Sequence, residues 1–259
     1  MELDGATALV TGANRGIGRA IVERLAREPL GVILAGVRDP AGFDPIEARV
    51  KVQPVRMDLS SRESIEESLA GLERRDEIDL LVNNAGRMTG GLLEEQNLDE
   101  VYAMFQVNLL GPIHLTRALL PAMVARGRGK VVNNASISGY AHFPAASTYA
   151  AAKTGVVAFS ESLRRELRGT GVSVLHLVTP GVETDMLEDT KRVYGGHMDT
   201  SVWTQVSPAE WAERVVRAIE SDQSVLGPGG RLALAKLASR GPAFLLDRIS
   251  AGLFSRDAG

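Results

Sequence analysis

The chain has 259 residues, of which 44% are hydrophobic and 24% charged, a composition typical of ordinary globular proteins. Its formal net charge of -3 gives no reason to expect nucleic acid as a partner. The absence of cysteine excludes disulfides, thiolate zinc sites and a cysteine nucleophile. The four histidines show no metal-ligand spacing, so we expect no metal site.

The N-terminus is acidic and leads into no long apolar segment, which predicts that there is no signal peptide. No uninterrupted apolar run is long enough to predict an integral membrane span. We therefore expect a cytoplasmic protein. No linker interrupts the chain, so residues 1–259 are predicted to form a single domain.

A glycine-rich turn follows the first predicted strand. Residues 6–10 form a short apolar run, and apolar residues recur at helical spacing after residue 18. Glycines between a strand and a helix allow a phosphate to reach the helix N-terminus, where free N–H groups and the helix dipole favour negative charge. The turn reads Thr11-Gly12-Ala13-Asn14-Arg15-Gly16-Ile17-Gly18.

Further buried strands alternate with helical or connecting segments, which predicts an α/β fold. We expect a doubly wound, three-layer Rossmann-type sandwich with about seven parallel strands and helices on both faces. In such a sheet, ligands meet the carboxyl ends of the strands, where this chain has polar residues. The further strands are predicted at residues 32–37, 50–57, 78–82, 130–135, 172–178 and 224–227, and the residues after them include Asp58, Leu59, Asn83, Asn84, Ala85, Gly86 and Ser136.

Three later segments complete the predicted layout. A long helix at residues 98–125 carries Asn108 among apolar side chains, where a polar group needs a partner. Residues 185–206 are rich in threonine, glycine and charge, which favours a mobile lid. Ser207 and Pro208 begin the last regular helix, which we expect to run to about residue 220.

Tyr149 and Lys153 are the two polar residues around three alanines in a helical run at residues 147–167. Their spacing of four residues is ~400° of rotation, so both side chains share one helix face. At ~4 Å and an effective dielectric of ~20, one ammonium is worth ~4 kcal/mol, enough to bring a tyrosine pKa toward neutrality. The pair is therefore a candidate general acid or base. The alternative is a chance pairing of a half-buried phenol and a solvated amine.

Together these motifs resemble the short-chain dehydrogenase/reductase family, in its short single-domain branch, over residues 5 to 185. The resemblance depends on the order and spacing of several marks. These are Thr11-Gly12-x-x-x-Gly16-x-Gly18, Asn83-Asn84-Ala85-Gly86, Asn108, Ser136, Tyr149-x-x-x-Lys153 and Pro180-Gly181 with Thr184.

The resemblance implies roles for four residues. Tyr149 is the expected general acid for carbonyl reduction, and Lys153 lowers its pKa and holds the nicotinamide ribose. Ser136 binds the substrate oxygen, and Asn108 helps to hold a water that relays protons. A hydride delivered to a carbonyl makes an alkoxide, which needs both a proton and a hydrogen-bond donor.

The family pattern also implies a dinucleotide site. Asp58 and Leu59 would flank the adenine, residues 84–86 would line the ribose and nicotinamide, and Val182 with Thr184 would hold the carboxamide. The expected cofactor-binding residues are Gly12, Asn14, Arg15, Gly16, Ile17, Gly18, Arg38, Asp58, Leu59, Asn84, Ala85, Gly86, Tyr149, Lys153, Pro180, Gly181, Val182 and Thr184.

We expect NADP rather than NAD as the cofactor. An NAD site has a carboxylate at the end of the second strand, where this chain has Gly36. Asp39 is the nearest acid and should point away, whereas Arg15 and Arg38 flank the position and suit a 2′-phosphate. In the alternative, both arginines are solvated and Asp39 binds the ribose.

The substrate is expected to be a small, mostly apolar carbonyl compound or alcohol. Alternatively, several of the apolar pocket residues named next only pack the core. The expected pocket residues are Met88, Ser136, Ile137, Tyr140, His142, Phe143, Tyr149, Met186 and Leu187, with Val202 and Trp203 from the lid.

Two places depart from the family pattern. Asn134 and Ala135 precede Ser136 where an apolar residue and a second serine are more usual, and Glu28-Pro29 replaces a glycine-centred turn. The favoured function is an NADP-dependent oxidoreductase that interconverts a carbonyl and an alcohol. A non-catalytic NADP-binding regulator on the same fold is the alternative, and such proteins typically lose the tyrosine or lysine. The longer epimerase or dehydratase branch is disfavoured by its different glycine spacing.

Family resemblance suggests a homodimer or homotetramer through the helices around residues 98–126 and 147–169. A C-terminal helical tail is predicted near residues 230–256, where apolar residues recur every four positions. We expect it to pack on the core or another subunit, with a membrane surface as the alternative. Its apolar residues are Leu245, Ile249 and Leu253, and its basic residues are Arg231, Lys236, Arg240, Arg248 and Arg256.

Overall fold

Parallel strands build the central sheet of the structure, a computed structural model that describes residues 1–194, 197 and 205–228 (backbone only at 190–193). Within these residues the sheet has seven strands in the order β3-β2-β1-β4-β5-β6-β9. This confirms the predicted Rossmann-type sheet. The strands are β1 (Thr7–Thr11), β2 (Val32–Val37), β3 (Lys51–Arg56), β4 (Ile78–Asn83), β5 (Gly129–Asn134), β6 (Val172–Leu177) and β9 (Val225–Leu226).

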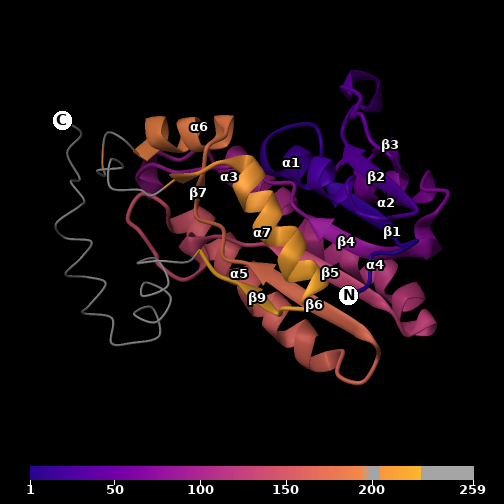
Figure 1. The fold of residues 1–259 in the computed structure, drawn as a ribbon. Coiled ribbons are helices and arrows are strands. Elements are labelled where there is room, and N and C mark those ends of the chain that lie inside the picture. The colour runs from indigo at the N-terminus through magenta and orange to yellow at the C-terminus, as the bar shows by residue number, and fades with distance from the viewer. Residues whose placement is uncertain (195–196, 198–204, 229–259) are drawn as a thin grey trace.

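Helices cover both faces of the sheet (Figure 1). Successive strand residues point to opposite faces, so each strand contributes to two apolar layers. One layer packs against α1 and α7, and the other against α2, α4 and α5. The helices are α1 (Gly16–Leu25), α2 (Arg62–Ala70), α3 (Leu98–Phe105), α4 (Gly111–Arg126), α5 (Ser147–Glu166), α6 (Asp185–Tyr194) and α7 (Pro208–Glu220).

Residues 38–50 connect β2 to β3 with only a short 3-10 helix, Pro40–Gly42. Proline and glycine in this segment disfavour an α-helix. Arg19 of α1 holds the segment, donating to the Asp44 carbonyl oxygen at 3.0 Å while its guanidinium lies 5.9 Å from the centre of the Phe43 ring. The strand itself is buried to its last residue, Val37, whereas Arg38 directly after it is exposed.

The predicted long helix at residues 98–125 is divided into α3, a π-helical turn at Gln106–Leu110, and α4. The amide of Gly111 donates to the Gln106 carbonyl, a π-type bond. Pro112 has no N–H to bind the Asn108 carbonyl, as a regular α-helix would require. The irregularity thus arises at Asn108 and Pro112.

By length and composition alone, the combined helix Leu98–Arg126 could cross a membrane, and 39% of its apolar window is buried inside the protein. A core helix of a globular protein passes the same test. In this fold Leu115, Leu119 and Met123 of α4 are buried against the sheet. Sheet packing therefore accounts for the apolar character of this face of α4.

The predicted lid is partly regular. Its first ten residues form α6, and Gln205–Val206 form β8, which pairs with β7 (Gly181–Val182). The expectation of mixed structure from 185 to 206 is thus corrected for these two segments. Val202, Trp203 and the predicted tail at residues 230–256 lie outside the described residues.

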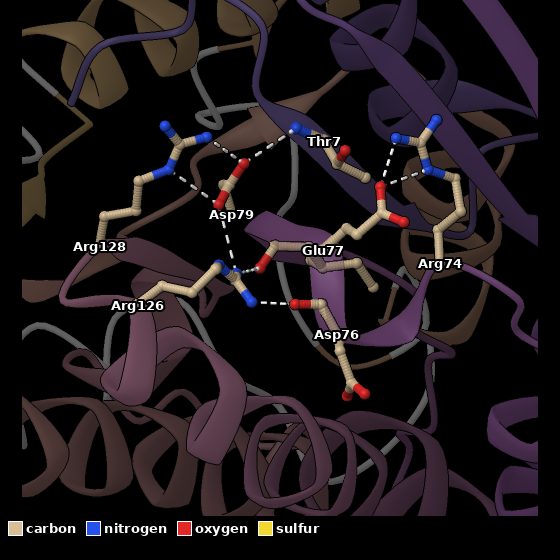
Figure 2. Close-up of polar contacts among 8 residues, drawn as sticks. Thr7, Arg74, Asp76, Glu77, Asp79, Arg126 and Arg128 are labelled. Carbon is tan, nitrogen blue, oxygen red and sulfur yellow. Dashed lines mark hydrogen bonds and ion pairs between the residues drawn. The ribbon is translucent and has the colours of Figure 1, made fainter.

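The buried carboxylate of Asp79 links the amino end of β4 to neighbouring segments (Figure 2). Asp79 is 3% exposed, and accepts from Arg128 Nη2 at 2.6 Å, Arg126 Nη2 at 3.2 Å and the Thr7 amide at 3.2 Å. Burial alone would raise the pKa of this carboxyl group, but the hydrogen bonds from Arg128 and Thr7 and both guanidinium charges hold that pKa below its usual value. Asp79 thereby joins β1, β4 and the end of α4.

We expect Asp79→Asn to lower the free energy of unfolding by about 2 kcal/mol at pH 7, because it removes a charged acceptor from two arginines. Since the folded-state pKa is depressed, the contribution is present above the unfolded pKa of about 3.9 and is lost as the pH falls through the folded value. Urea denaturation at pH 7 and pH 3 measures both effects. Asp76→Asn is the control, because Arg126 contacts only the Asp76 carbonyl and the carboxylate points away in Figure 2. An equal loss in both variants would contradict this role.

Candidate active site

The strand order places a crevice between the carboxyl ends of β1 and β4. The chain passes from β1 to β2 on one side, whereas β4 lies on the other side of β1. In open parallel sheets, ligands bind at this reversal of strand order. The glycine turn leaves β1 there, and residues 84–86 leave β4 beside it. The two segments that the sequence singled out therefore meet at one place.

Close backbone packing requires glycine in the turn. Gly12 and Gly16 have φ angles of +66° and +54°. A Cβ atom at Gly12 would lie 2.9 Å from the Ala85 Cα, and one at Gly18 would lie 2.1 Å from the Gly12 carbonyl oxygen. α1 begins at Gly16, so its first amides and the positive end of its dipole face this cradle. The arrangement fits the phosphates of a dinucleotide.

Ser136, Tyr149 and Lys153 come together at the end of β5 and the start of α5. Ser136 hydrogen-bonds with the Tyr149 phenol. Lys153 Nζ lies 5.6 Å from the Tyr149 ring centre and donates to the Asn134 carbonyl oxygen at 2.7 Å. Ser136 and Lys153 are only 9% and 5% exposed. The three polar groups thus meet where Ser136 and Lys153 are buried and Tyr149 is half-buried.

Burial controls the proton affinities of this pair. It raises the pKa of Tyr149 to about 12, although the hydrogen bond with Ser136 lowers that pKa in part. Burial also lowers the pKa of Lys153 to about 8. The expectation that Lys153 brings the Tyr149 pKa toward neutrality is not met in this structure, because burial disfavours the phenolate. Tyr149 is therefore protonated at neutral pH.

Asn108 binds the loop that follows β4. Its side-chain oxygen accepts from the Arg87 amide at 2.8 Å, and its side-chain nitrogen donates to the Arg87 carbonyl at 2.8 Å. These two bonds satisfy a side chain that is 1% exposed and supply the partner that the sequence required. Gly86 lies directly beside this contact, since a Cβ there would be 3.3 Å from the Asn108 oxygen. Asn108 thus fixes the backbone at the edge of the site.

The residues around the end of β2 have distinct environments. Gly36 is packed so closely that a Cβ would lie 3.1 Å from the Met57 Cβ. Asp39 accepts from the Ala41 amide at 3.0 Å and caps the short helix that follows. Arg38 is exposed, and within the described part of the chain it makes no ion pair. The carboxylate is used by its own loop, whereas the guanidinium faces solvent.

Other predicted cofactor residues also have protein partners. Arg15 pairs with Asp185 of α6 at 3.3 Å, and both side chains are exposed. Asp58 accepts from the Ser60 amide at 3.0 Å, and Leu59 is buried in the core. These contacts stabilise the local turns. The ion pair between Arg15 and Asp185 lies on the surface, where solvent screens it.

The segment after β6 passes from the crevice into the lid. Pro180 is followed by β7, whose pairing with β8 anchors this crossing. Thr184 donates to the Val182 carbonyl at 3.1 Å. Its γ-methyl group would lie 3.2 Å from a Cβ at Gly16. The base of the lid therefore packs against the glycine turn.

The predicted pocket residues have different surroundings in the structure. Met88 and Phe143 pack in one apolar cluster, near the lid, whose other members are Ala145, Ala146 and Tyr194. Leu187 is buried in α6, and Met186 is 37% exposed. His142 contacts Thr154 at 3.2 Å, and Ile137 packs beside Tyr140. Tyr140 is not in the wall, since it is buried and its hydroxyl binds His176 at 2.7 Å.

Tyr194 at the end of α6 packs with the predicted pocket residues Met88 and Phe143, and the sequence reasoning missed it. It is 3% exposed, its hydroxyl lies 3.9 Å from the Met88 sulfur, and a Cβ at Gly90 would lie 2.2 Å from its ring. Burial, together with the charge of the Tyr149 phenolate, raises the pKa of Tyr194. Its spacing of seven residues from Leu187 on one helix face is the signal that could have found it.

The geometry agrees with the relatives of the chain. The family model of the short chain dehydrogenases matches residues 6–194. The 3-oxoacyl-(acyl-carrier-protein) reductase FabG of Haemophilus influenzae is 37% identical over 190 residues, which are 72% of this chain and 78% of that protein. The residues matched by the family model include the glycine turn and the start of the helix that carries Tyr149.

Solved structures have the same fold. A short-chain dehydrogenase from Burkholderia cenocepacia in complex with NADP has a TM-score of 0.81 and 25% identity, over 96% of this chain and 99% of that one. An actinorhodin polyketide ketoreductase with NADPH has a TM-score of 0.77 and 31% identity, over 90% of this chain and 99% of that one. Both likenesses extend well beyond residue 194.

The lowered pKa of Lys153 predicts how stability depends on pH. Between the folded pKa of about 8 and the unfolded value of 10.5, the unfolded chain binds a proton that the folded protein has released. Stability therefore rises with pH across this window, by on the order of 3 kcal/mol in full.

Lys153→Met removes the titrating group and with it this dependence. Urea denaturation from pH 7.5 to 10 should show the wild type gaining stability relative to the variant as the pH rises. Lys51→Met, on the exposed edge strand β3, should follow the wild type throughout. A difference between wild type and Lys153→Met that stays constant with pH would contradict the assignment.

Proposed function

The chain belongs to the short-chain dehydrogenase family, and we propose that it is an NADP-dependent oxidoreductase that interconverts a carbonyl group and an alcohol, with Tyr149 as the general acid. One observation supports this most strongly. The protonated phenol of Tyr149, which is half-buried, meets the buried hydroxyl of Ser136 and the buried amine of Lys153 near the end of β5. The glycine cradle of the same sheet edge fits a dinucleotide.

When bound, NADPH would supply a hydride to the carbonyl carbon. The carbonyl oxygen gains negative charge as the carbon is reduced, and the Ser136 hydroxyl is placed to donate a hydrogen bond to it. Tyr149 then gives its proton to that oxygen, and the product is an alcohol. With a pKa of about 12, Tyr149 holds this proton at neutral pH.

Lys153 and Asn108 support the proton transfer from two sides. The Lys153 ammonium donates a hydrogen bond to the Asn134 carbonyl oxygen at 2.7 Å. Its charge stabilises the phenolate that forms when Tyr149 gives up its proton. Its pKa of about 8 keeps most of the amine charged at pH 7. Asn108 holds the Arg87 backbone beside Gly86 and so shapes the loop that faces the site.

The preference for NADP is supported by the end of β2. Gly36 offers no carboxylate to a ribose 2′-hydroxyl, and Asp39 caps its own loop. The exposed Arg38 can form charge-assisted hydrogen bonds to a 2′-phosphate. The related structures from Burkholderia and of actinorhodin ketoreductase contain NADP and NADPH.

We propose an uncharged, mostly apolar substrate, since Met88, Phe143, Leu187 and Tyr194 lie along the lid side of the site. The segment near 185–206 acts as the lid of a single domain in this proposal. Exposed apolar residues at Leu98, Tyr102 and Leu110 favour a homodimer or homotetramer through α3 and α4. We place this reaction in the cytoplasm.

A panel of aldehydes, ketones and acidic keto compounds with NADPH tests the proposal, and a preference for acidic sugars or acyl phosphates would contradict the apolar pocket.

Tyr149→Phe should bind NADPH as the wild type does, but kcat should fall by ~10² to 10⁴ because the general acid is lost. Tyr102→Phe, an exposed tyrosine on α3, should retain full activity. More than about a tenth of wild-type kcat in folded Tyr149→Phe would remove Tyr149 from the role. NADPH binding without turnover of any compound would favour a regulatory protein instead.

Arg38→Ala should lower kcat/KM with NADPH by ~10 to 100-fold and leave kcat/KM with NADH nearly unchanged, because only NADPH carries the 2′-phosphate. Steady-state kinetics with both cofactors measure the ratio. Arg168→Ala, an exposed arginine after α5, is the control and should keep the wild-type ratio. Equal values with both cofactors in the wild type, or a preference that survives Arg38→Ala, would exclude this role.

A further inference from the structure

Asn134, the last residue of β5, stands where the sequence departs from the family pattern, and it has an unusual set of partners. Its side-chain oxygen accepts from Thr179 Oγ1 at 2.5 Å, at the end of β6. Its side-chain nitrogen donates to Asn84 Oδ1 at 3.0 Å, at the end of β4. Its backbone carbonyl accepts from Lys153 at 2.7 Å. One residue thus contacts the two neighbouring strand ends and the helix that carries Tyr149.

These bonds form part of a longer chain across the sheet. Thr179 donates to Asn134, Asn134 donates to Asn84, and Asn84 Nδ2 donates to the Thr11 carbonyl at 3.1 Å. The chain crosses the ends of β6, β5, β4 and β1 in their spatial order. Because each amide donates on one side and accepts on the other, each bond fixes the orientation of the next and the bonds strengthen one another.

The chain runs directly under the groups that the proposed reaction uses. Thr179 precedes the Pro180–Thr184 segment, and its carbonyl accepts from the Ile137 amide at 3.0 Å, next to Ser136. Asn84 leads into the loop that Asn108 holds. A shift of Asn134 would therefore move both walls of the crevice and the partner of Lys153 together.

We propose that Asn134 is a positioning residue: it sets the separation of Asn84 and Thr179, the two sides that would hold the nicotinamide end of the cofactor, and holds Lys153 beside Tyr149. This inference rests on the proposed function. An apolar residue at this position would keep only the backbone bond to Lys153. Small displacements of positioned reactants cost large factors in rate, so the effect should exceed that of a lost surface hydrogen bond.

The neighbouring Asn133 offers a matched control. It lies in the same strand and is 0% exposed, and its side chain points to the opposite face. There it accepts from Asn83 at 2.8 Å and donates to Ser160 at 2.9 Å. These bonds link β4, β5 and α5 within the core. Asn133→Leu therefore removes two buried amide bonds from the same strand without touching the crevice.

The experiment compares wild type, Asn134→Leu and Asn133→Leu, which change equally many side-chain atoms. In Asn134→Leu we expect the Kd for NADPH to rise about 10-fold and kcat to fall ~10 to 100-fold, with the melting temperature within a few degrees of the wild type. In Asn133→Leu we expect a lower melting temperature with Kd and kcat within about twofold. NMR of the cofactor-free proteins should show faster exchange of the Asn84 side-chain amide only in Asn134→Leu.

Thr179→Val provides a second route, because it removes the hydroxyl at the other end of the bond and should reproduce part of both kinetic effects. Unchanged Kd and kcat in folded Asn134→Leu, or equal kinetic losses in Asn133→Leu, would overturn the inference. A wild type that binds NADPH and is active, with an unaffected Asn134→Leu, rejects this inference alone. A wild type that binds no NADPH rejects the proposed function as well.

Discussion

The polar groups at the carboxyl edge of the sheet must be satisfied at the place that a ligand has to approach. Strand ends leave backbone N–H and C=O groups without a ladder partner, and burial makes such groups costly. Thr11 Oγ1 meets this need by accepting from the amides of Asn84 and Ala85, both at 3.0 Å. Asn84 then joins Thr11 to Asn134, and Asn134 joins β4 to β6.

This satisfaction by side chains has a structural consequence. The bonds join the ends of β1, β4, β5 and β6 to one another, and such side-chain bridges preorganise this edge of the sheet. The glycines of the turn depend on the same packing, because Gly12 touches Ala85 and Gly18 touches the Gly12 carbonyl. Close backbone approach and side-chain bridges together determine where phosphates and nicotinamide would lie.

Burial also sets the chemistry of the site. An exposed tyrosine and lysine four residues apart would shift one another only weakly, whereas this pair is largely removed from water. Desolvation then disfavours both charged forms and separates the two pKa values to about 12 and about 8 in the direction that neutralises each group. Such a site keeps the proton on the phenol at neutral pH, as the proposed general acid requires.

The sequence predicted the fold well because its signals are local. Apolar runs indicate the buried strands, and individual residues indicate the glycine turn and the Ser207 cap. The bounds predicted for each strand agree with the structure to within about two residues. The sequence predicted no strand order, which the structure supplies. The break at Asn108 was not predicted, because helical periodicity continues through residues 98–125 and the π turn adds only one residue.

Features that depend on distant contacts could not be predicted. The sequence showed Asn134 as a departure without a role, since its partners Asn84 and Thr179 are 50 and 45 residues away. Tyr194 was missed because only the folded α6 brings it over Met88. The pKa of Tyr149 was estimated from the charge of Lys153 alone, and spacing in a sequence carries no measure of desolvation.

The arginines near the cofactor site show how magnitude decides between two contacts. Arg15 pairs with Asp185, but both side chains are more than 70% exposed, and such surface pairs are worth about 0 to 1 kcal/mol. A charge-assisted hydrogen bond to a phosphate is worth ~1.5 to 3 kcal/mol. A phosphate bound at the glycine turn would therefore replace Asp185 as the partner of Arg15. Asp39, in contrast, is held by the cap of its own loop. Of the two arginines, Arg38 is thus exposed and makes no ion pair with the described residues, whereas Arg15 links the glycine turn to the base of α6.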